Sequence, residues 1–208
     1  MRATKGNNMN LTKSKKGNNM KAYHFTGATL SEGYPIPEIG ETLIYDGYPV
    51  IIPDECGLYA SAHPFDALKY AHGNMLHLVK LGGTVAIGHK EDRWTASERT
   101  IIKTIDASGA LRKFACDQAM SVAHFWHMPE VVKEYLTSRM PSLRKAARTA
   151  AIAAARKAPW AVWAAIEATR EAAWEAAFKA AMEATRENCI DTARAEFKHL
   201  VTNKFEKG

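Results

Sequence analysis

Three short patterns in the first half of the chain combine side chains that can bind a ligand with small turn residues. They are YHFTG at residues 23–27, CGLYAS at residues 56–61 and DALKYA at residues 66–71. A histidine at a strand end supplies a directional hydrogen-bond donor or acceptor, and a tyrosine ring supplies a stacking face for a planar heterocycle. A turn glycine lets the backbone approach a ligand closely. His24, Tyr59 and Tyr70 are therefore candidate ligand-binding residues if the fold brings them together.

These patterns lie in a part of the chain that is typical of short strands and turns, from residue 21 to about residue 107. β-Branched and aromatic segments bounded by glycine, proline or aspartate are expected as strands: residues 21–25, 42–45, 48–52, 57–61, 75–81, 84–87 and 100–105. Asp46-Gly47 predicts a hairpin turn, and Gly82-Gly83 predicts a second one. Pro64 suits the first turn of a short helix that carries the third pattern.

From residue 108 onward apolar residues recur at helical spacing, so the second half of the chain is expected to be helical. The expected helices begin at capping or first-turn residues: residues 109–126, 129–137 and 142–159. An alanine-rich stretch follows, with Trp174, Phe178 and Met182 at intervals of four residues. It forms either one helix over residues 159–204, about 70 Å long, or a shorter antiparallel pair with a break near Asn188.

The change of pattern near residue 108 predicts an α+β protein, in which a small mixed or antiparallel sheet domain is followed by alanine-rich helices. Four parts are expected along the chain. They are a disordered basic extension over residues 1–19, an α/β ligand-binding domain over residues 20–107, helices packed on it over residues 108–140, and an alanine-rich helical tail over residues 141–208.

The net charge of +6 is concentrated at the start of the chain. Residues 1–21 contain six lysines and arginines and no acid, so the remaining residues sum to zero and a nucleic-acid partner is not expected. The pentamer KGNNM occurs twice there, and its back-translation can read as a ribosome-binding sequence, a spacer and a start codon. Translation is therefore expected to begin at Met20; the alternative is a basic disordered arm that touches nucleic acid. No stretch reaches the roughly 18 apolar residues of a membrane helix, so no membrane partner is expected.

The three cysteines, Cys56, Cys116 and Cys189, form no CxxC pair, which favours free thiols in a reducing compartment. His124 and His127 could share one face of a helix with Cys116 as a third metal ligand. Histidines on helix surfaces or partly buried between helices are much commoner, so no metal is expected.

In order and spacing, the three patterns resemble the NAD-binding half of the ADP-ribosyltransferase fold, in the branch of the poly(ADP-ribose) polymerases and RNA 2′-phosphotransferases. That family has a strand ending in an HGT or HGS turn, a GIYFA-like strand, and a second tyrosine eleven positions after the first. The resemblance implies that His24 binds a ribose hydroxyl and that Tyr59 and Tyr70 flank the nicotinamide ring. The backbone at Thr26 and Gly27 would hold the amide, and the remaining ligand-binding residue lies at the end of the second pattern: Ser61.

The same family places a late acidic residue on the strand that lines its cleft, where it orients the ribose and stabilises an oxocarbenium-like transition state. Residues 100–105 contain no glutamate. Glu98, just before that segment, is the candidate catalytic acid, and Glu91 and Asp106 are the alternatives. The ligand implied by the resemblance is NAD or an NAD-derived nucleotide, with ADP-ribosyl transfer as the associated reaction.

Residues 20–135 and the tail also look like an uncharacterised family of bacteriophage proteins. Its members open with AYHFTG, continue through GLxAS, HPFDAL and GNMLHLV segments, and end in alanine tandem repeats. This resemblance implies a phage or prophage origin, action in the bacterial host cytoplasm, and a bacterial host protein as partner, for example in interference with host defence. It implies no biochemical activity.

Two hypotheses remain open. In the first, the protein binds NAD or an NAD-derived nucleotide through His24, Tyr59 and Tyr70. In the second, it is a non-catalytic interaction protein whose helices present aromatic side chains to a partner or to a second copy of the chain. The aromatic residues concerned are Trp160, Trp163, Trp174 and Phe178.

Overall fold

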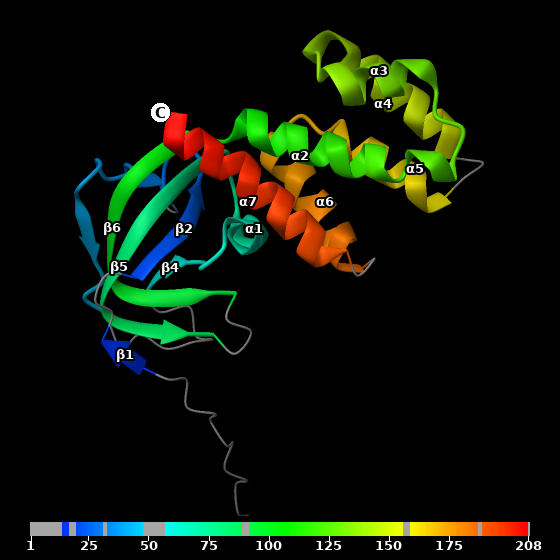
Figure 1. Ribbon diagram of the computed structural model, residues 1–208. Helices are drawn as coiled ribbons and strands as arrows, with labels where there is room; N and C mark the ends of the chain where they lie inside the picture. Colours follow the sequence, from blue (N-terminus) through cyan, green and yellow to red (C-terminus); the bar gives the residue numbers. More distant parts are fainter. Residues whose placement is uncertain are drawn as a thin grey trace, which may run out of the picture.

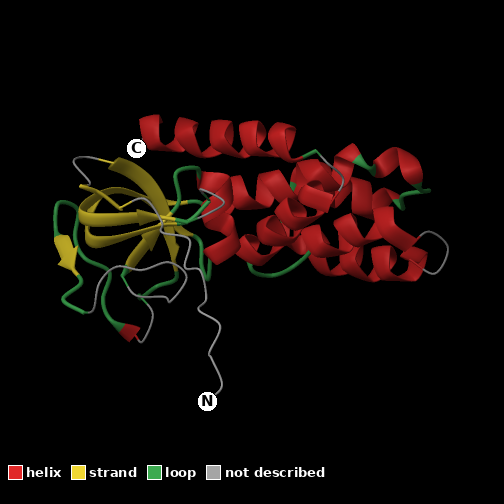
Figure 2. Ribbon diagram, turned by 90° about the horizontal axis from the view of Figure 1, so that it is seen from below, coloured by secondary structure: helices red, strands yellow, loops and turns green. Residues whose placement is uncertain are grey.

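A curled antiparallel sheet forms one end of the protein and a layer of helices forms the rest, as Figures 1 and 2 show. The computed structural model describes residues 14–16, 20–30, 33–47, 57–88, 92–155, 159–186 and 189–207. The predicted α+β class is confirmed, with strands concentrated before residue 107 and helices after it.

Two long strands, β5 (Met75–Ile87) and β6 (Trp94–Asp106), form the centre of the sheet and pair with each other. Strand β2 (Met20–Thr26) pairs with β5, and both β3 (Thr42–Ile44) and β4 (Leu58–Ala60) pair with β6. Every described pairing is antiparallel. The predicted strand over residues 48–52 lies outside the described residues.

The pairing of β5 with β6 is irregular at two points, between Leu78 and Val79 and between Gly82 and Val85. Gly83 has a φ of 64°, the left-handed conformation that glycine adopts in one type of bulge. The prediction that Gly82-Gly83 forms a hairpin turn is therefore wrong, because this pair lies inside one continuous strand. Bulges increase the local twist, which helps β5 and β6 to curl.

The curled sheet nearly closes on itself through the segment after β4. The Tyr23 amide donates to the Ser61 carbonyl at 2.8 Å, and the Ser61 amide donates to the Tyr23 carbonyl at 2.9 Å. The chain around β4 therefore bridges β6 and β2. The enclosed side, here called the inner face, is packed with alanine and branched aliphatic side chains: Ala22, Ala60, Val79, Leu81, Val85, Ala96 and Ile101.

A short helix and a 3-10 turn connect the sheet to β5, namely α1 (Pro64–Ala67) and η2 (Leu68–Tyr70). His63 caps this helix, because its Nδ1 accepts a hydrogen bond from the Phe65 amide at 3.2 Å. The helices after β6 have the following bounds: α2 (Ser108–Ser121), η3 (Ala123–Phe125), α3 (Glu130–Ser138), α4 (Pro141–Ala155), α5 (Pro159–Ala168), α6 (Ala173–Arg186) and α7 (Ile190–Lys207).

The alanine-rich stretch after residue 159 is not one helix, so the unbroken alternative is wrong. It divides after Ala168 and again after Arg186, close to the break expected near Asn188. Arg112 of α2 stabilises the first division by donating to three backbone carbonyls, those of Ala168, Arg170 and Glu171. That contact comes from a residue more than fifty positions away, which local helix propensity could not reveal.

Helices α6 and α7 return to the sheet and cover its other side, here called the helix face. Phe25 and Leu76 of the sheet pack in one cluster with Phe114 of α2, Ala177 of α6 and Phe197 of α7. Figure 1 shows α7 running back toward the strands, with α3, α4 and α5 at the far end of the helical layer. A second apolar cluster joins the rest of α2 to those three helices.

The aromatic stripe of the alanine-rich stretch is used mainly in this packing. Trp174 is half-buried against the cluster that covers the helix face, and Phe178 is also half-buried. Trp163 on α5 remains 56% exposed. The side chain of Trp160 lies outside the described residues.

Residues 14–16 differ from the expected disordered extension. Ser14–Lys16 form strand β1, which pairs with Thr84, Val85 and Ala86 of β5. For these three residues the prediction of disorder is wrong, because the edge of β5 beyond β2 offers unpaired backbone groups. The other residues of the extension lie outside the described part of the chain. No helix within the described part is both long and apolar enough to cross a membrane.

Candidate functional site

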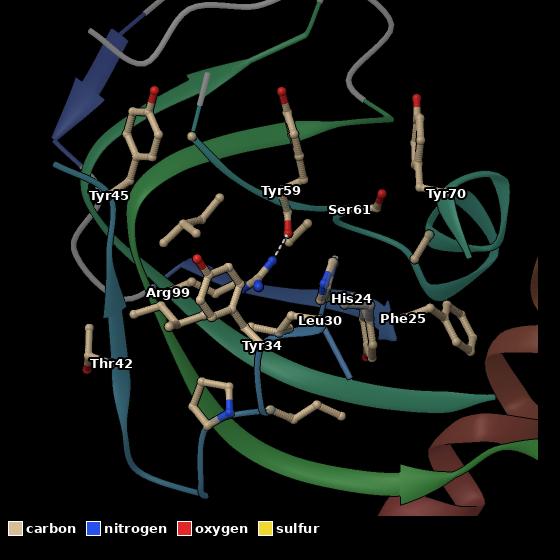
Figure 3. Close-up of a pocket in the computed structure, with 18 of the residues that line it drawn as sticks. His24, Phe25, Leu30, Tyr34, Thr42, Tyr45, Tyr59, Ser61, Tyr70 and Arg99 are labelled. Carbon is tan, nitrogen blue, oxygen red and sulfur yellow. Dashed lines mark hydrogen bonds between the residues drawn. The ribbon is translucent and has the colours of Figure 1, made fainter. Parts of the chain in front are cut away.

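A cavity of about 1240 Å³ opens beside the inner face of the sheet and the chain that links β2 to β3. Figure 3 shows tyrosine rings, the His24 imidazole and the Arg99 guanidinium around this space. Residues far apart in the sequence therefore meet at one hollow. Four predicted ligand-binding residues line it: His24, Tyr59, Ser61 and Tyr70.

The four residues reach the cavity from two directions. Tyr59 and Ser61 alternate along the chain with Ala60, which packs on the inner face. In Figure 3 the Tyr59 and Tyr70 rings extend to one side of the segment that carries Ser61, while His24 and Arg99 lie on its other side. The predicted convergence of an imidazole and two phenol rings is therefore met only in part, with one shared cavity and two walls.

His24 lies directly opposite His77 in the pairing of β2 with β5, and their ring centroids are 6.4 Å apart. Burial lowers the pKa of His24 well below its usual value, and the nearby charge of Arg99 lowers it further. The His24 imidazole is therefore neutral near pH 7. A neutral imidazole can donate one hydrogen bond and accept another.

Thr26 and Gly27 do not line the cavity, although the resemblance assigned them to the ligand. The Thr26 hydroxyl lies 2.9 Å from Nε2 of His77, whose Nδ1 lies 2.8 Å from the Thr104 hydroxyl. Gly27 packs against Gly73 so closely that a Cβ on Gly73 would lie 2.3 Å from the Gly27 Cα. Both residues of the turn therefore support the strand ends behind His24.

Arg99 is a cavity residue that the sequence analysis missed. It is only 6% exposed, and its Nη1 donates to the Tyr59 carbonyl at 2.7 Å. Burial lowers the pKa of this guanidinium to about 10, which still leaves it charged at pH 7. Among the ion pairs of the described residues, none joins Arg99 to a carboxylate. The cavity therefore contains a buried positive charge.

Arg93, at the edge of β6, lies between the two predicted stacking residues. Its Cζ is 3.7 Å from the centroid of the Tyr59 ring and 5.0 Å from that of the Tyr70 ring. Burial raises the pKa of the Tyr70 phenol, and the neighbouring charge of Asp92 raises it further. The space expected for a planar ring is therefore occupied by the planar side chain of Arg93.

Glu98, the predicted catalytic acid, does not line the cavity. Its exposed side chain passes over the glycine pair of β5, so that a Cβ on Gly82 would lie 2.7 Å from its Oε2. Adjacent residues of a strand point to opposite faces, and here Arg99 is buried at the cavity whereas Glu98 is exposed on the other face. Glu98 is thus not positioned to act on a ligand in this cavity.

The structure does not place either alternative to Glu98 at the cavity. Glu91 lies outside the described residues, and Asp106 is at the far end of β6, where its Oδ1 accepts a hydrogen bond from the Ser108 amide at 2.8 Å. That contact with Ser108 lowers the pKa of Asp106. Among the described residues, the carboxylates that line the cavity are Glu38 and Glu41, which lie before β3 and are exposed.

The residues considered for a metal are spread over two helical regions. Cys116 is fully buried in the second apolar cluster, and burial raises the pKa of its thiol to about 11. The His124 ring stacks on Phe125, with 3.9 Å between the centroids. Within the described residues, no three histidine, cysteine or acidic side chains are grouped to hold a metal ion.

Chemically, the cavity can accept an anionic group at Arg99 and a hydrogen-bonding group at His24, whereas Arg93 occupies the space between Tyr59 and Tyr70. Comparison with known proteins adds no further assignment. No protein-family model, no curated protein and no solved structure matches the chain.

Proposed function

We propose that this protein binds a nucleotide, NAD or an NAD-derived nucleotide, in the cavity lined by His24, Tyr59, Tyr70 and Arg99. The observation that carries the proposal is the guanidinium of Arg99. It is buried at the cavity, and its described hydrogen bond goes to a neutral carbonyl. Removing a charge from water without an opposite charge is costly, so such a group in a cavity favours an anionic ligand.

The chemistry of a guanidinium narrows the class of ligand. Its planar array of donors matches the oxygens of phosphate or carboxylate and makes charge-assisted hydrogen bonds to them. The pyrophosphate of a dinucleotide would bring negative charge to Arg99 and also favour the protonated form of His24. The cavity, at about 1240 Å³, exceeds the roughly 300–1,000 Å³ of common small-ligand sites, which leaves room for a dinucleotide.

The proposal concerns binding first and reaction second. ADP-ribosyl transfer requires a group that stabilises positive charge on the ribose. Of the carboxylates that the structure describes, Glu38 and Glu41 line the cavity and Glu98 does not. If transfer occurs, we assign that role to one of these two. A phage protein acting on a bacterial host protein in the host cytoplasm is the setting that the sequence resemblance suggests, and it forms part of the same proposal.

Isothermal titration calorimetry with ADP-ribose, NAD and cyclic ADP-ribose tests the binding proposal. Arg99→Met removes the buried charge, and loss of charge-assisted hydrogen bonds to phosphate should weaken ADP-ribose binding about 100-fold. Lys80→Met is the matched control, because Lys80 is exposed on β5, does not line the cavity and carries the same charge. Both variants should unfold cooperatively on heating. Failure of the wild-type protein to bind any of the three, or equal affinity in Arg99→Met, would refute the proposal.

The second candidate is a non-catalytic interaction protein, and exposed apolar side chains on the far helices favour it. Trp163 on α5 is 56% exposed and Ile152 on α4 is 49% exposed. Aromatic side chains dominate many protein interfaces, so Trp163 is the residue on which this alternative rests.

A further inference from the structure

The Tyr59 and Tyr70 rings hold the Arg93 guanidinium between them. The guanidinium carbon lies 3.7 Å from one ring centroid and 5.0 Å from the other, both within the range of a cation–π contact. The rings come from β4 and η2, while Arg93 directly precedes β6. Three separate segments therefore build one aromatic slot at the rim of the cavity.

Within the described part of the chain, the Arg93 guanidinium contacts ring faces and forms no ion pair with an acid. Its Nε is buried without a hydrogen-bond partner, and none of the ion pairs among the described residues includes it. The adjacent Asp92 instead accepts a hydrogen bond from Lys69 at 3.1 Å. A buried donor left without a partner is unfavourable. The position of Arg93 thus has a cost that the ring contacts offset.

We propose that Arg93 is a displaceable occupant of the Tyr59–Tyr70 slot: its guanidinium fills the slot in the free protein and leaves when a planar cationic ring enters. The proposal rests on the proposed function insofar as the natural ring is taken to be the oxidised nicotinamide of a dinucleotide. The slot itself is defined by the geometry around Arg93.

The exchange requires movement of one side chain only. The backbone of Arg93 is fixed at the sheet edge, where its carbonyl accepts a hydrogen bond from the Gly88 amide at 2.9 Å. A displaced guanidinium can extend into solvent on its flexible stem. A cationic ring replaces one cation–π contact by another, whereas a neutral ring of the same shape does not. The slot should therefore prefer the cationic ring.

Two small probes separate charge from shape: 1-methylnicotinamide, which is a planar cation, and nicotinamide, which is its neutral analogue. Their binding can be followed by NMR of ¹³C-labelled tyrosine rings, with Tyr59 and Tyr70 assigned from phenylalanine variants. In Arg93→Ala the slot is empty, so the cation should shift both ring signals and bind at least tenfold more tightly than to the wild-type protein. In that variant it should also bind about two- to fivefold more tightly than nicotinamide.

Three variants decide between a slot and a general loss of charge. Lys80→Ala removes a positive charge outside the cavity and should leave binding of 1-methylnicotinamide unchanged. Arg93→Ala/Tyr70→Ala should lose the gain seen in Arg93→Ala. Arg93→Gln gives a second test in case the alanine variant does not fold, with a gain in the same direction. Equal binding of the cation to the wild-type protein and to both Arg93 variants overturns the displacement, and equal binding of the two probes overturns the selectivity for charge.

A nucleotide titration then links the slot to the rest of the cavity. The affinity ratio of NAD to ADP-ribose isolates the ring, because both ligands carry the same phosphates. This ratio should rise at least tenfold in Arg93→Ala. If neither nucleotide binds, the proposed function fails, while the two nicotinamide probes still decide whether the slot exists.

Discussion

The sheet half and the helical half of the molecule bury different kinds of side chain. In the helical half the buried residues are largely alanines, with a few aromatic and aliphatic side chains between them. Burying a polar group costs free energy unless a hydrogen-bond partner is close. A half of the molecule that buries several polar groups therefore has a requirement besides stability. Of the seven buried polar or charged residues described, only Thr169 lies in the helical half, and the others are in the sheet half: Thr26, Ser61, Asp66, His77, Thr95 and Arg99.

The largest expected effect tests whether the two halves are one cooperative unit. Phe197 of α7 is fully buried, and its ring lies 5.2 Å from that of Phe114 in the cluster that covers the helix face. Phe197→Ala should destabilise the fold by about 3–5 kcal/mol. Urea denaturation followed by circular dichroism and by tryptophan fluorescence should give one coincident transition.

The control is Met182→Ala, because Met182 on α6 is 43% exposed and should contribute below about 1 kcal/mol. Two separate transitions in the Phe197 variant would show that the sheet and the helices unfold independently. The two halves would then be separate domains rather than one cooperative unit.

A pH titration tests how a buried polar residue of the sheet half, His77, affects the free energy of unfolding. Burial lowers the pKa of His77 to about 4, whereas an unfolded histidine titrates near pH 6.5. Between these values the unfolded state binds the additional proton. The free energy of unfolding should therefore fall as the pH decreases from about 6.5 to 4, by on the order of 3 kcal/mol from this residue.

The variant His77→Gln tests this origin, since glutamine can still hydrogen-bond to Thr26 and Thr104 but does not titrate. Urea midpoints measured across that pH range should vary less steeply in the variant than in the wild-type protein. Parallel pH profiles would show that the acid sensitivity originates elsewhere.

Two glycines, one from each half, are expected to respond to alanine with opposite signs. Gly83 in the β5 bulge has a φ of 64°, and a Cβ there would meet the Ser97 hydroxyl at 2.0 Å. Gly83→Ala should destabilise by about 1–2 kcal/mol. Gly109 lies in the first turn of α2 with open space around it, its nearest neighbour being Lys204 Nζ at 3.6 Å. Gly109→Ala should stabilise by about 0.5–1 kcal/mol. Differential scanning calorimetry measures both, and shifts of the same sign would contradict this account.

The smallest effect on stability is expected at Trp163. Trp163→Gln should change the free energy of unfolding by less than about 0.5 kcal/mol, because the side chain is 56% exposed. Gel filtration with light scattering tests the interaction hypothesis at the same residue. An oligomer that becomes a monomer in the variant would support an interface there, whereas a monomer in both would count against self-association through α5.

The sequence predicted the composition of the fold better than its connections. Alternation and helical spacing identified β2, β4, η2 and α2 because those signals are local. The Gly82-Gly83 pair was misread because the same two residues suit a hairpin turn and a bulge, and only the length of the β5–β6 pairing decides between them. The break after Ala168 depends on a distant arginine, Arg112, and therefore left no local signal.

The residues that line the cavity were predicted only in part, because only some of them stand in patterns that are visible locally. His24, Tyr59 and Tyr70 occupy recognisable patterns, and all three line the cavity. Alternation places Glu98 and Arg99 on opposite faces of β6, but it does not say which of the two faces borders the cavity. Arg93 was missed because an arginine at a strand edge is ordinary until the two tyrosine rings are placed around it.

Helix α7 also affects how the protein can fold during synthesis. The aromatic and aliphatic side chains on the helix face of β2 and β5, such as Phe25 and Leu76, are covered in part by Phe197 and Val201. Until residues 190–207 leave the ribosome, those strands lack that cover, and a nascent chain with exposed apolar strands is prone to aggregate or to bind chaperones. A truncated product released before α7 is made would expose this apolar surface, so cellular proteases should degrade that product.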